Sequence, residues 1–469
     1  MKKILSLLLT VSMCLTMAVA ALADETVVQN TVPATVSGAY VVMNAETGQI
    51  LVQKNMNERY YPASITKILT AAIALEVGSP KDQYEITYED VFSYKFPGTT
   101  YVALTHDEVV TVEQLLNATL MASANDAANC LGSYVATKLG RTALNDKGEE
   151  SYVQGFVEIL NEKLEEIGCT DTHFTNAHGL HNGEHYTTAA DMAKITQYAL
   201  SVEGFRDFFG AVSYTMAPTN MQPLERSWGT QSGIFVSSNK YYYEGATGAK
   251  LGYTDEAGHT MVSVAERNDV ELICVLLDCR QGNWADHRDS ASLYDYCFNN
   301  FDTVTYTVED LKQRSVPIYK ENAIYEKAQL TAQSDYSIQL HKLLSKRDVK
   351  FASNAPGRWF YGDRMKATLS FALTRSAIKN VGEAMYTELG SIPLNVEAVP
   401  LKVDEPTILD HVLDFLLVAL KVFAVMFAVL VVVILILRAY NIRRYKKIRE
   451  KRRQRQLERQ KQEKEKLNQ

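Results

Sequence analysis

An apolar run close to the C-terminus constrains this chain more than any other feature. The stretch "FLLVALKVFAVMFAVLVVVILIL" occupies residues 415–437. As a helix at about 1.5 Å per residue it would be roughly 34 Å long, enough to cross a bilayer core of about 30 Å. Lys421 lies near one end of the run, where its long stem can reach the polar interface. The sequence therefore predicts one transmembrane helix at 415–437.

The charge distribution gives this span an orientation. From Arg438 to the end there are 14 basic and 4 acidic residues, a net charge of 14 − 4 = +10, so the remainder of the −7 chain carries −7 − 10 = −17. Basic residues directly after a span mark the cytoplasmic side. We therefore expect a single-pass protein of the cell membrane, with 438–469 as a basic cytoplasmic tail that attracts membrane lipid and an extracellular body. Nucleic acid is not an expected partner, because from Arg443 onward Tyr445 is the only aromatic residue among the charges.

The N-terminus has the pattern of an export signal. Lys2 and Lys3 precede an apolar stretch, and Ala21-Leu22-Ala23 fits a small-x-small cleavage site. We expect a signal peptide at 1–23, with an uncleaved anchor as the alternative because the stretch is long. Residues 24–37 are polar and rich in Thr and Val, which favours a flexible lead-in.

The body between these segments has two textures. Residues 38–302 contain a hairpin pattern in "GAYVVMNAETGQILVQKN", helical patterns such as "YVQGFVEILNEKLEEIG", and strand patterns in "GHTMVSVAERNDVELICVLLD". Strands, then helices, then strands predict an α+β or three-layered domain. Residues 303–403 contain short alternating runs such as "KATLSFALT", which predict a small, mainly β domain.

The segment "YYPASITKILTA" places Ser64 and Lys67 one helical turn apart, on one helix face. Pro62 suits the entry to a helix, and N–H groups at a helix start can stabilise an oxyanion. Lys67 can act as a base only if burial or a nearby positive charge lowers its pKa. Taken alone the pair is weak, and a capped helix start remains the alternative.

Two further segments carry chemistry. "MASANDAAN" supplies Ser123 and Asn125, and "GAKLGYTDEAGHT" supplies Lys250 and Gly252. A second serine can pass a proton to a leaving amine, and an asparagine can hold a peptide group. The charge of Lys250 would depress the pKa of Lys67 and attract a substrate carboxylate. Gly252 allows another backbone to approach the strand closely.

These three motifs, in this order, resemble those of penicillin-binding proteins and serine β-lactamases. With the flanking segments "YTTAADMA" and "FTNAHGL", the stretch 38–301 is most similar to the D-alanyl-D-alanine carboxypeptidases of low molecular mass. The resemblance implies an α/β/α sandwich of the β-lactamase and transpeptidase type, and a serine enzyme that trims the terminal D-alanine of peptidoglycan stem peptides. It also implies peptidoglycan pentapeptide as substrate, β-lactams as covalent inhibitors, and no cofactor or metal.

The resemblance assigns roles as well. Ser64 would be the acylated nucleophile, Lys67 its base and Ser123 a proton carrier. The backbone N–H groups of Ser64 and Tyr253 would form the oxyanion hole. The expected substrate-binding positions are Asn125, Lys250, Gly252, Tyr253 and Thr254.

Residue 251 departs from the family. There the strand motif has a Thr or Ser whose hydroxyl helps to bind the terminal carboxylate of the substrate, and here the residue is Leu251. The missing charge-assisted hydrogen bond is worth about 1.5–3 kcal/mol unless Thr254 or Tyr253 replaces it. A weakly active or inactive homologue that binds cell-wall peptide or acts as a scaffold is therefore the alternative function.

Two rival functions fit the sequence less well. His178, His181 and His185 match no common zinc spacing. A β-lactamase that activates water through a Glu-x-x-x-Asn motif is not favoured, because 126–249 contains no such motif and Ala124 replaces the usual Asp. Both facts favour a peptidase.

Overall fold

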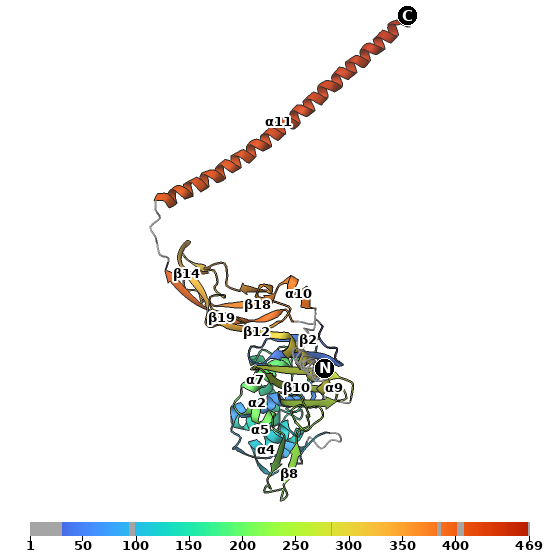
Figure 1. Cartoon of the computed structure of the whole chain (residues 1–469), viewed down its shortest axis with the longest axis vertical. Coiled ribbons are helices and arrows are strands. Elements are labelled where there is room, and N and C mark those ends of the chain that lie inside the picture. Colours follow the sequence, from blue (N-terminus) through green and yellow to red (C-terminus); the bar gives the residue numbers. More distant parts are fainter. Residues whose placement is uncertain (1–30, 93–98, 283, 382–385, 401–407, 468–469) are drawn as a thin grey trace, which may run out of the picture. The chain divides into compact units, whose positions relative to one another are not determined.

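The computed structural model describes residues 31–92, 99–282, 284–381, 386–400 and 408–467 (Figure 1). The predicted signal peptide lies outside the described residues, as does the first half of the predicted lead-in, 24–30. Contacts divide the chain into two units, Met1–Asn322 with Ala328–Ala398, and Ala323–Lys327 with Val399–Gln469.

A five-stranded antiparallel sheet is the centre of the first unit. Its order is β2-β1-β11-β10-β9, so strands from both ends of the domain meet, and Val41 of β1 is paired with Val275 of β11. The strand β9 lies at one edge of this sheet. The strands are β1 (Ser37–Asn44), β2 (Ile50–Lys54), β9 (Ala246–Thr254), β10 (Gly258–Arg267) and β11 (Val270–Cys279).

Both faces of the sheet are buried. Val41 and Val275 belong to one hydrophobic cluster, whereas the neighbouring Val42 and Cys274 belong to another on the opposite face. Successive side chains of a strand point to opposite faces, so runs such as "YVVM" and "LICVLL" are apolar throughout. The sheet is therefore the middle layer of three.

Helices form the two outer layers. Figure 1 shows α9 (Ala285–Asn300) on one side of the sheet and α2, α5 and α7 on the other. This architecture confirms the predicted α+β fold class. The helices that share the larger cluster are α2 (Lys67–Val77), α3 (Tyr88–Phe92), α4 (Val112–Leu120), α5 (Asn125–Leu139), α6 (Tyr152–Glu166), α7 (Ala189–Ser201) and α8 (Phe205–Phe209). Two-stranded antiparallel sheets among them are formed by β3 (Gln83–Glu85) with β4 (Val109–Thr111), β5 (Ala143–Leu144) with β6 (Glu150–Ser151), and β7 (Ser213–Met216) with β8 (Arg226–Gly229).

A smaller β-rich region follows α9. The strands β12 (Phe301–Tyr306) and β15 (Tyr336–His341) pair with each other, and the remaining six form a sheet in the order β16-β18-β19-β14-β13-β17. This region contains β13 (Val316–Lys320), β14 (Ala323–Ala332), η2 (Lys346–Asp348), β16 (Val349–Ser353), β17 (Trp359–Phe360), β18 (Ala367–Leu373), α10 (Arg375–Val381) and β19 (Glu388–Pro400).

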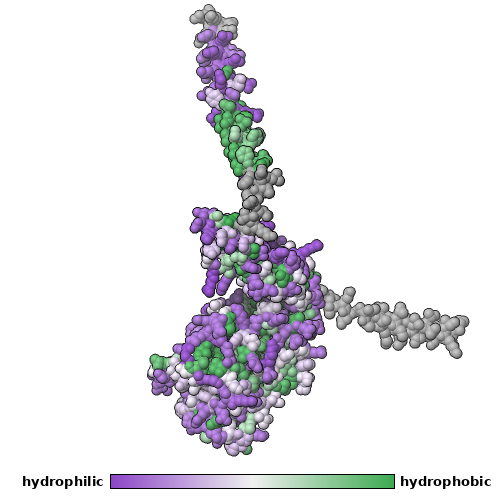
Figure 2. Space-filling view, turned by 90° about the vertical axis from the view of Figure 1, so that its left-hand side faces the viewer, coloured by the Kyte–Doolittle hydropathy of each residue, from purple (hydrophilic) through white to green (hydrophobic). Residues whose placement is uncertain are grey.

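The second unit is dominated by one long helix, α11 (Ile408–Leu467). Figure 2 shows an apolar band along α11 followed by hydrophilic residues toward its C-terminal end. Within the described residues, one helical stretch is long and apolar enough to cross a membrane, Phe415–Gln462, with a mean hydropathy of 3.1 at its most apolar part. The predicted span is its N-terminal half, and the predicted tail continues the same helix.

Candidate active site

Ser64 lies in a tight helical turn, η1 (Ala63–Thr66), that leads directly into α2. Ala63 has a φ of 50°, a conformation that L-residues rarely adopt. The hydroxyl of Thr66 donates to the carbonyl of Ala63 at 2.9 Å and lies 2.9 Å from Nε2 of His185. Strained backbone that is held in this way is typical of functional sites. The turn presents Ser64 to a pocket while its neighbours stay buried.

Lys67 is fully buried directly beneath Ser64. Its Nζ lies 3.0 Å from Oγ of Ser64, 2.7 Å from Oδ1 of Asn125 and 2.7 Å from the carbonyl oxygen of His178. The last two atoms can only accept hydrogen bonds. A neutral amine would donate its two hydrogens to them and direct its lone pair at the Ser64 hydroxyl. The geometry therefore suits proton abstraction from Ser64 by Lys67.

The electrostatics favour the neutral amine. Burial lowers the pKa of Lys67 well below its ordinary value, and the charge of Lys250 lowers it further, while Asp126 acts in the opposite direction. Removal from water disfavours the charged form of any amine. Both conditions that the sequence set for Lys67 as a base are therefore met.

A second lysine–serine pair lies on the other side of the pocket. Nζ of Lys250, on β9, donates to Oγ of Ser123 at 2.8 Å and to the carbonyl of Leu251 at 2.8 Å. Burial lowers the pKa of Lys250 to about 7. Ser123 has a φ of 60° between α4 and α5, which is the second strained residue in this site. Ser123 lines the same pocket as Ser64.

Two glycines allow β9 and the loop around Gly179 to lie directly against the turn that holds Ser64. A Cβ added to Gly252 would lie 2.7 Å from the backbone nitrogen of Ser64, and one added to Gly179 would lie 1.9 Å from the carbonyl oxygen of Ala63. Only glycine permits such approaches. The backbone of β9 therefore runs beside the N–H of Ser64, as an oxyanion hole built from Ser64 and Tyr253 requires.

Asp126 organises the rim and was not singled out by the sequence. Its buried carboxylate accepts from the N–H groups of Val102 at 3.2 Å and Leu104 at 3.1 Å. The neighbouring Asn125 donates its N–H to the carbonyl of Thr100 at 2.8 Å. The start of α5 thus fixes the loop that carries Thr100 into the pocket. In the sequence, this role could have been suspected only from the position of Asp126 directly after the Ser-x-Asn motif.

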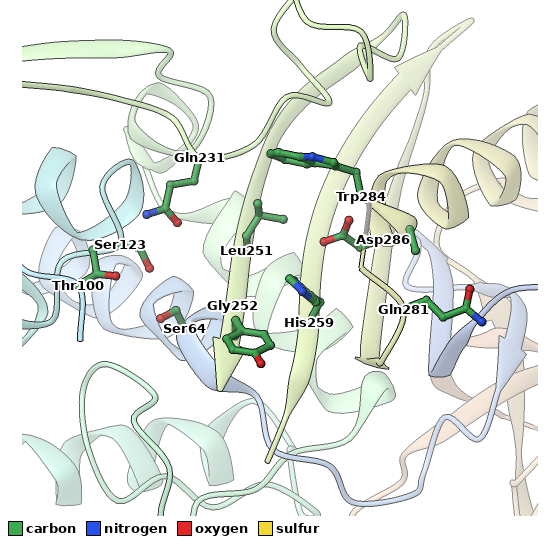
Figure 3. A pocket seen from close by; sticks show the side chains of 12 residues that line it. Ser64, Thr100, Ser123, Gln231, Leu251, Gly252, His259, Gln281, Trp284 and Asp286 are labelled. Carbon is green, nitrogen blue, oxygen red and sulfur yellow. The ribbon is translucent and has the colours of Figure 1, made fainter. Parts of the chain in front are cut away.

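The pocket has a volume of about 440 Å³ and is shown in Figure 3. Of the predicted residues, Ser64, Ser123, Gly252 and Tyr253 line it, while Lys67, Asn125 and Lys250 reach it through the contacts above. Thr254 is the last residue of β9, where its Oγ1 accepts from the N–H of Ala257 in the following turn at 3.0 Å. It is not among the lining residues, which are Ser64, Thr100, Ser123, Gln231, Leu251, Gly252, Tyr253, His259, Gln281, Trp284, Ala285 and Asp286.

His181 and His185, the other two histidines of the segment 178–185, contact protein side chains and backbone groups. Burial lowers the pKa of His185 to about 3, so its ring is neutral. It accepts from the N–H of Thr175 at 3.0 Å through Nδ1, and His181 packs edge-on against Tyr61. Across the part of the chain that the structure describes, no group of three His, Cys, Asp or Glu residues is placed to hold a metal ion.

Comparisons with known proteins agree with this geometry. The sequence model of the D-alanyl-D-alanine carboxypeptidase family, Peptidase_S11, matches residues 26–281, more than half of the chain. The carboxypeptidase DacF of Bacillus subtilis (strain 168) is 28% identical over 347 residues, which are 72% of this chain and 79% of DacF. DacA of Escherichia coli (strain K12) is 26% identical over 309 residues, 64% of this chain and 70% of DacA.

Solved structures show the same fold. Penicillin binding protein 5 from Haemophilus influenzae superposes with a TM-score of 0.59 at 22% identity, covering 79% of this chain and 98% of that one. The family match runs past the end of β11 and includes all three motifs, those of Ser64 and Lys67, of Ser123 and Asn125, and of Lys250 and Gly252. This chain therefore belongs to the D-alanyl-D-alanine carboxypeptidase family of serine peptidases.

Proposed function

We propose that this protein is a membrane-anchored serine D-Ala-D-Ala carboxypeptidase that removes the terminal D-alanine of peptidoglycan stem peptides through an acyl-enzyme on Ser64. The contact that carries the proposal is the 3.0 Å approach of the Lys67 nitrogen to the Ser64 oxygen at the floor of an open pocket. A nucleophile within hydrogen-bond reach of a neutral base is the arrangement that acyl transfer needs.

The steps follow from the contacts. Lys67 takes the proton of Ser64, whose Oγ attacks the carbonyl carbon between the two D-alanines. The N–H groups of Ser64 and Tyr253 stabilise the oxyanion. Ser123 delivers a proton to the leaving nitrogen, the C–N bond breaks, and an ester on Ser64 remains. Water then hydrolyses the ester and restores the serine.

The remaining segments fit an enzyme that works on the cell wall. We assign a signal peptide to 1–23, a lead-in to 24–37, the catalytic domain to 38–302, a β-rich domain to 303–403, the span to 415–437 and the tail to 438–469. Strand β1 begins at Ser37, one residue before the proposed catalytic domain, and β12 crosses the proposed 302/303 boundary. The apolar helix supports a membrane anchor, and the basic residues after Leu437 support a cytoplasmic tail.

Labelling with a fluorescent penicillin, followed by peptide mapping, tests the proposal. β-Lactams acylate the same nucleophile in this mechanism, so the label should map to Ser64. A label on Ser123, or full labelling of Ser64→Ala, would overturn the assignment.

A non-catalytic role in binding cell-wall peptide is the second candidate, and Leu251 favours it. Leu251 lines the pocket at the position where the family has a hydroxyl, and the predicted substitute Thr254 does not line it. Turnover of a D-Ala-D-Ala peptide that equals that of Ser64→Ala, combined with peptide binding, would support this role instead.

A further inference from the structure

The active-site pocket continues past Leu251, away from the nucleophile. Figure 3 shows Leu251 on β9 with Ser64, Ser123 and Gln231 on one side, and Trp284 and Asp286 on the other. Position 251 is where relatives of this family contact the terminal carboxylate. In the proposed reaction, the half of the pocket beyond Leu251 therefore receives the leaving group.

Asp286 places a negative charge in this half. It is the second residue of α9 and only 5% exposed, and its Oδ1 accepts from the backbone N–H of His287 at 2.8 Å and from the Nδ1–H of the same ring at 2.9 Å. Burial raises the pKa of Asp286, but the hydrogen bonds and electrostatic interaction with His287 outweigh it, with a smaller contribution from His259, so the net direction is downward. Its carboxylate is therefore ionised at neutral pH.

The contacts of the other ring nitrogen, Nε2, show that His287 carries its hydrogen on Nδ1. Nε2 of His287 accepts from the backbone N–H of Gly233 at 3.2 Å and lies 3.3 Å from Oγ of Ser232. The other ring nitrogen must then carry the hydrogen and donate it to Asp286. The start of α9 and the loop at 232–233, which are far apart in the chain, thus hold the Asp286 carboxylate at the pocket wall.

Positive charge is scarce around the same space. Among the described residues that line the pocket there is no Lys or Arg, and His259 alone can carry a positive charge. The amine of Lys250 is 2% exposed and donates to Ser123 and to the Leu251 carbonyl. Leu251 and the half-exposed Trp284 add apolar walls. The terminal carboxylate of a substrate bound here would be repelled by the buried carboxylate of Asp286. It would also lack the hydroxyl that a Thr or Ser supplies in the family and that Leu251 replaces.

We propose that this half of the pocket selects leaving groups in which the carboxylate of the second D-alanine is converted to an amide, and most of all an amide that carries an ammonium group near Asp286. The inference rests on the proposed acyl transfer to Ser64 and names the leaving group that this site prefers. Asp286 is then a specificity-determining residue, and Leu251 and Trp284 contact the uncharged part of the leaving group.

The chemistry of the step is unchanged. The ester to Ser64 Oγ forms, the C–N bond between the two D-alanines breaks, and the leaving nitrogen gains a proton. Water hydrolyses the ester, so one water is consumed for each amine released. Such a preference suits hydrolysis of D-alanyl-D-alanine sequences that continue into a further amide.

Three matched peptides test the proposal with the full-length wild-type protein in detergent. All contain diacetyl-L-lysyl-D-alanyl-D-alanine, ending in a free carboxylate, a primary amide or a 2-aminoethyl amide. The released D-alanine, or its amide, is measured. We expect kcat/KM to rise in the order carboxylate, amide, aminoethyl amide, with about tenfold or more between the first and the last.

Asp286→Asn keeps the shape of the side chain and removes its charge. We expect this variant to lose the advantage of the aminoethyl amide over the neutral amide and to cleave the free carboxylate better than wild type. Asp269→Asn in the β10–β11 turn is the matched control, because it changes the net charge equally at a residue of positive φ remote from the pocket. It should leave the order of the three substrates as in wild type.

The outcomes separate this inference from the proposed function. If wild type cleaves the peptide with the free carboxylate best, the inference is overturned while the carboxypeptidase function stands. If that preference also grows as the pH is lowered, His259 is the group that binds the carboxylate. If no peptide is cleaved, and Ser64 is not labelled by penicillin, both fail. The wild-type order decides the question even if Asp286→Asn does not fold, which its thermal unfolding midpoint would reveal.

Discussion

The side-chain nitrogen of Lys67 lies 3.0 Å from the hydroxyl oxygen of Ser64, although both residues sit at the start of one helix and could have pointed to solvent. The lysine is fully buried, and its other two contacts are carbonyl oxygens from Asn125 and His178. None of these three contacts of the Lys67 amine is to a carboxylate. In the proposed mechanism this burial favours the neutral amine, the form in which Lys67 can act as a base.

The first prediction concerns this pair. Ser64→Ala should abolish penicillin labelling, and Lys67→Ala should reduce the acylation rate by about 10³-fold or more, because nucleophile and base act as one unit. Stopped-flow acylation with a fluorescent penicillin measures the rate of Lys67→Ala, and a rate close to that of wild type would contradict the prediction.

The second prediction concerns Gly252. Its replacement by Ala would place a Cβ 2.7 Å from the nitrogen of Ser64 and 2.5 Å from Oγ1 of Thr260, so β9 must shift away from the nucleophile. We expect acylation to slow by about 10²- to 10³-fold, as when an oxyanion donor is lost. Gly183→Ala, whose Cβ would have no neighbour within 4 Å, is the control and should acylate at the wild-type rate.

The third prediction concerns pH and stability. Burial sets the pKa of Lys250 at about 7 in the folded protein, below the ordinary value of 10.5. Between these values the unfolded chain holds a proton that the folded one lacks, so raising the pH favours folding. The free energy of unfolding of wild type, relative to Lys250→Met, should therefore rise by up to about 1.4 kcal/mol per pH unit above pH 7. Urea unfolding from about pH 6 to about pH 8.5 measures the difference. A flat or falling difference would show that Lys250 stays charged.

The fourth prediction concerns Leu251. Leu251→Thr restores a hydroxyl beside the leaving group and should raise kcat/KM for a peptide with a free D-Ala-D-Ala end. A charge-assisted hydrogen bond of about 1.5–3 kcal/mol corresponds to a gain of roughly 10- to 150-fold. Combining it with Asp286→Asn should raise the gain further. An unchanged value would mean that another group already holds the carboxylate.

The fifth prediction concerns topology. Protease added to intact protoplasts should digest the body and spare an epitope placed at the C-terminus, because basic residues follow the span at 415–437. A chain that ends at residue 400 should be released in soluble form and still be labelled by penicillin at Ser64. A C-terminal epitope that is digested in intact protoplasts would reverse the orientation.

The sequence by itself was sufficient for the local chemistry and for the fold class. Ser64 and Lys67 are three residues apart, so helical spacing alone places them on one face. The runs around Val41 and Cys274 are apolar at every position, and both faces of their strands are buried. The apolar run at 415–437 forms a continuous helix in α11. Each of these features depends on residues that are close together in the chain, and the spacing of apolar and polar residues is visible in the sequence.

Only the tertiary structure decided which distant groups share the pocket. Lys67 meets Asn125 across 58 residues, and Lys250 meets Ser123 across 127. The position of Asp286 depends on where α9 begins after β11 and on the contacts of His287 with the loop at 232–233. No local pattern marks that carboxylate as a pocket residue. Strand order, and the packing of α9 against the sheet, bring it opposite Leu251, because contacts between distant segments are set by the burial of whole layers.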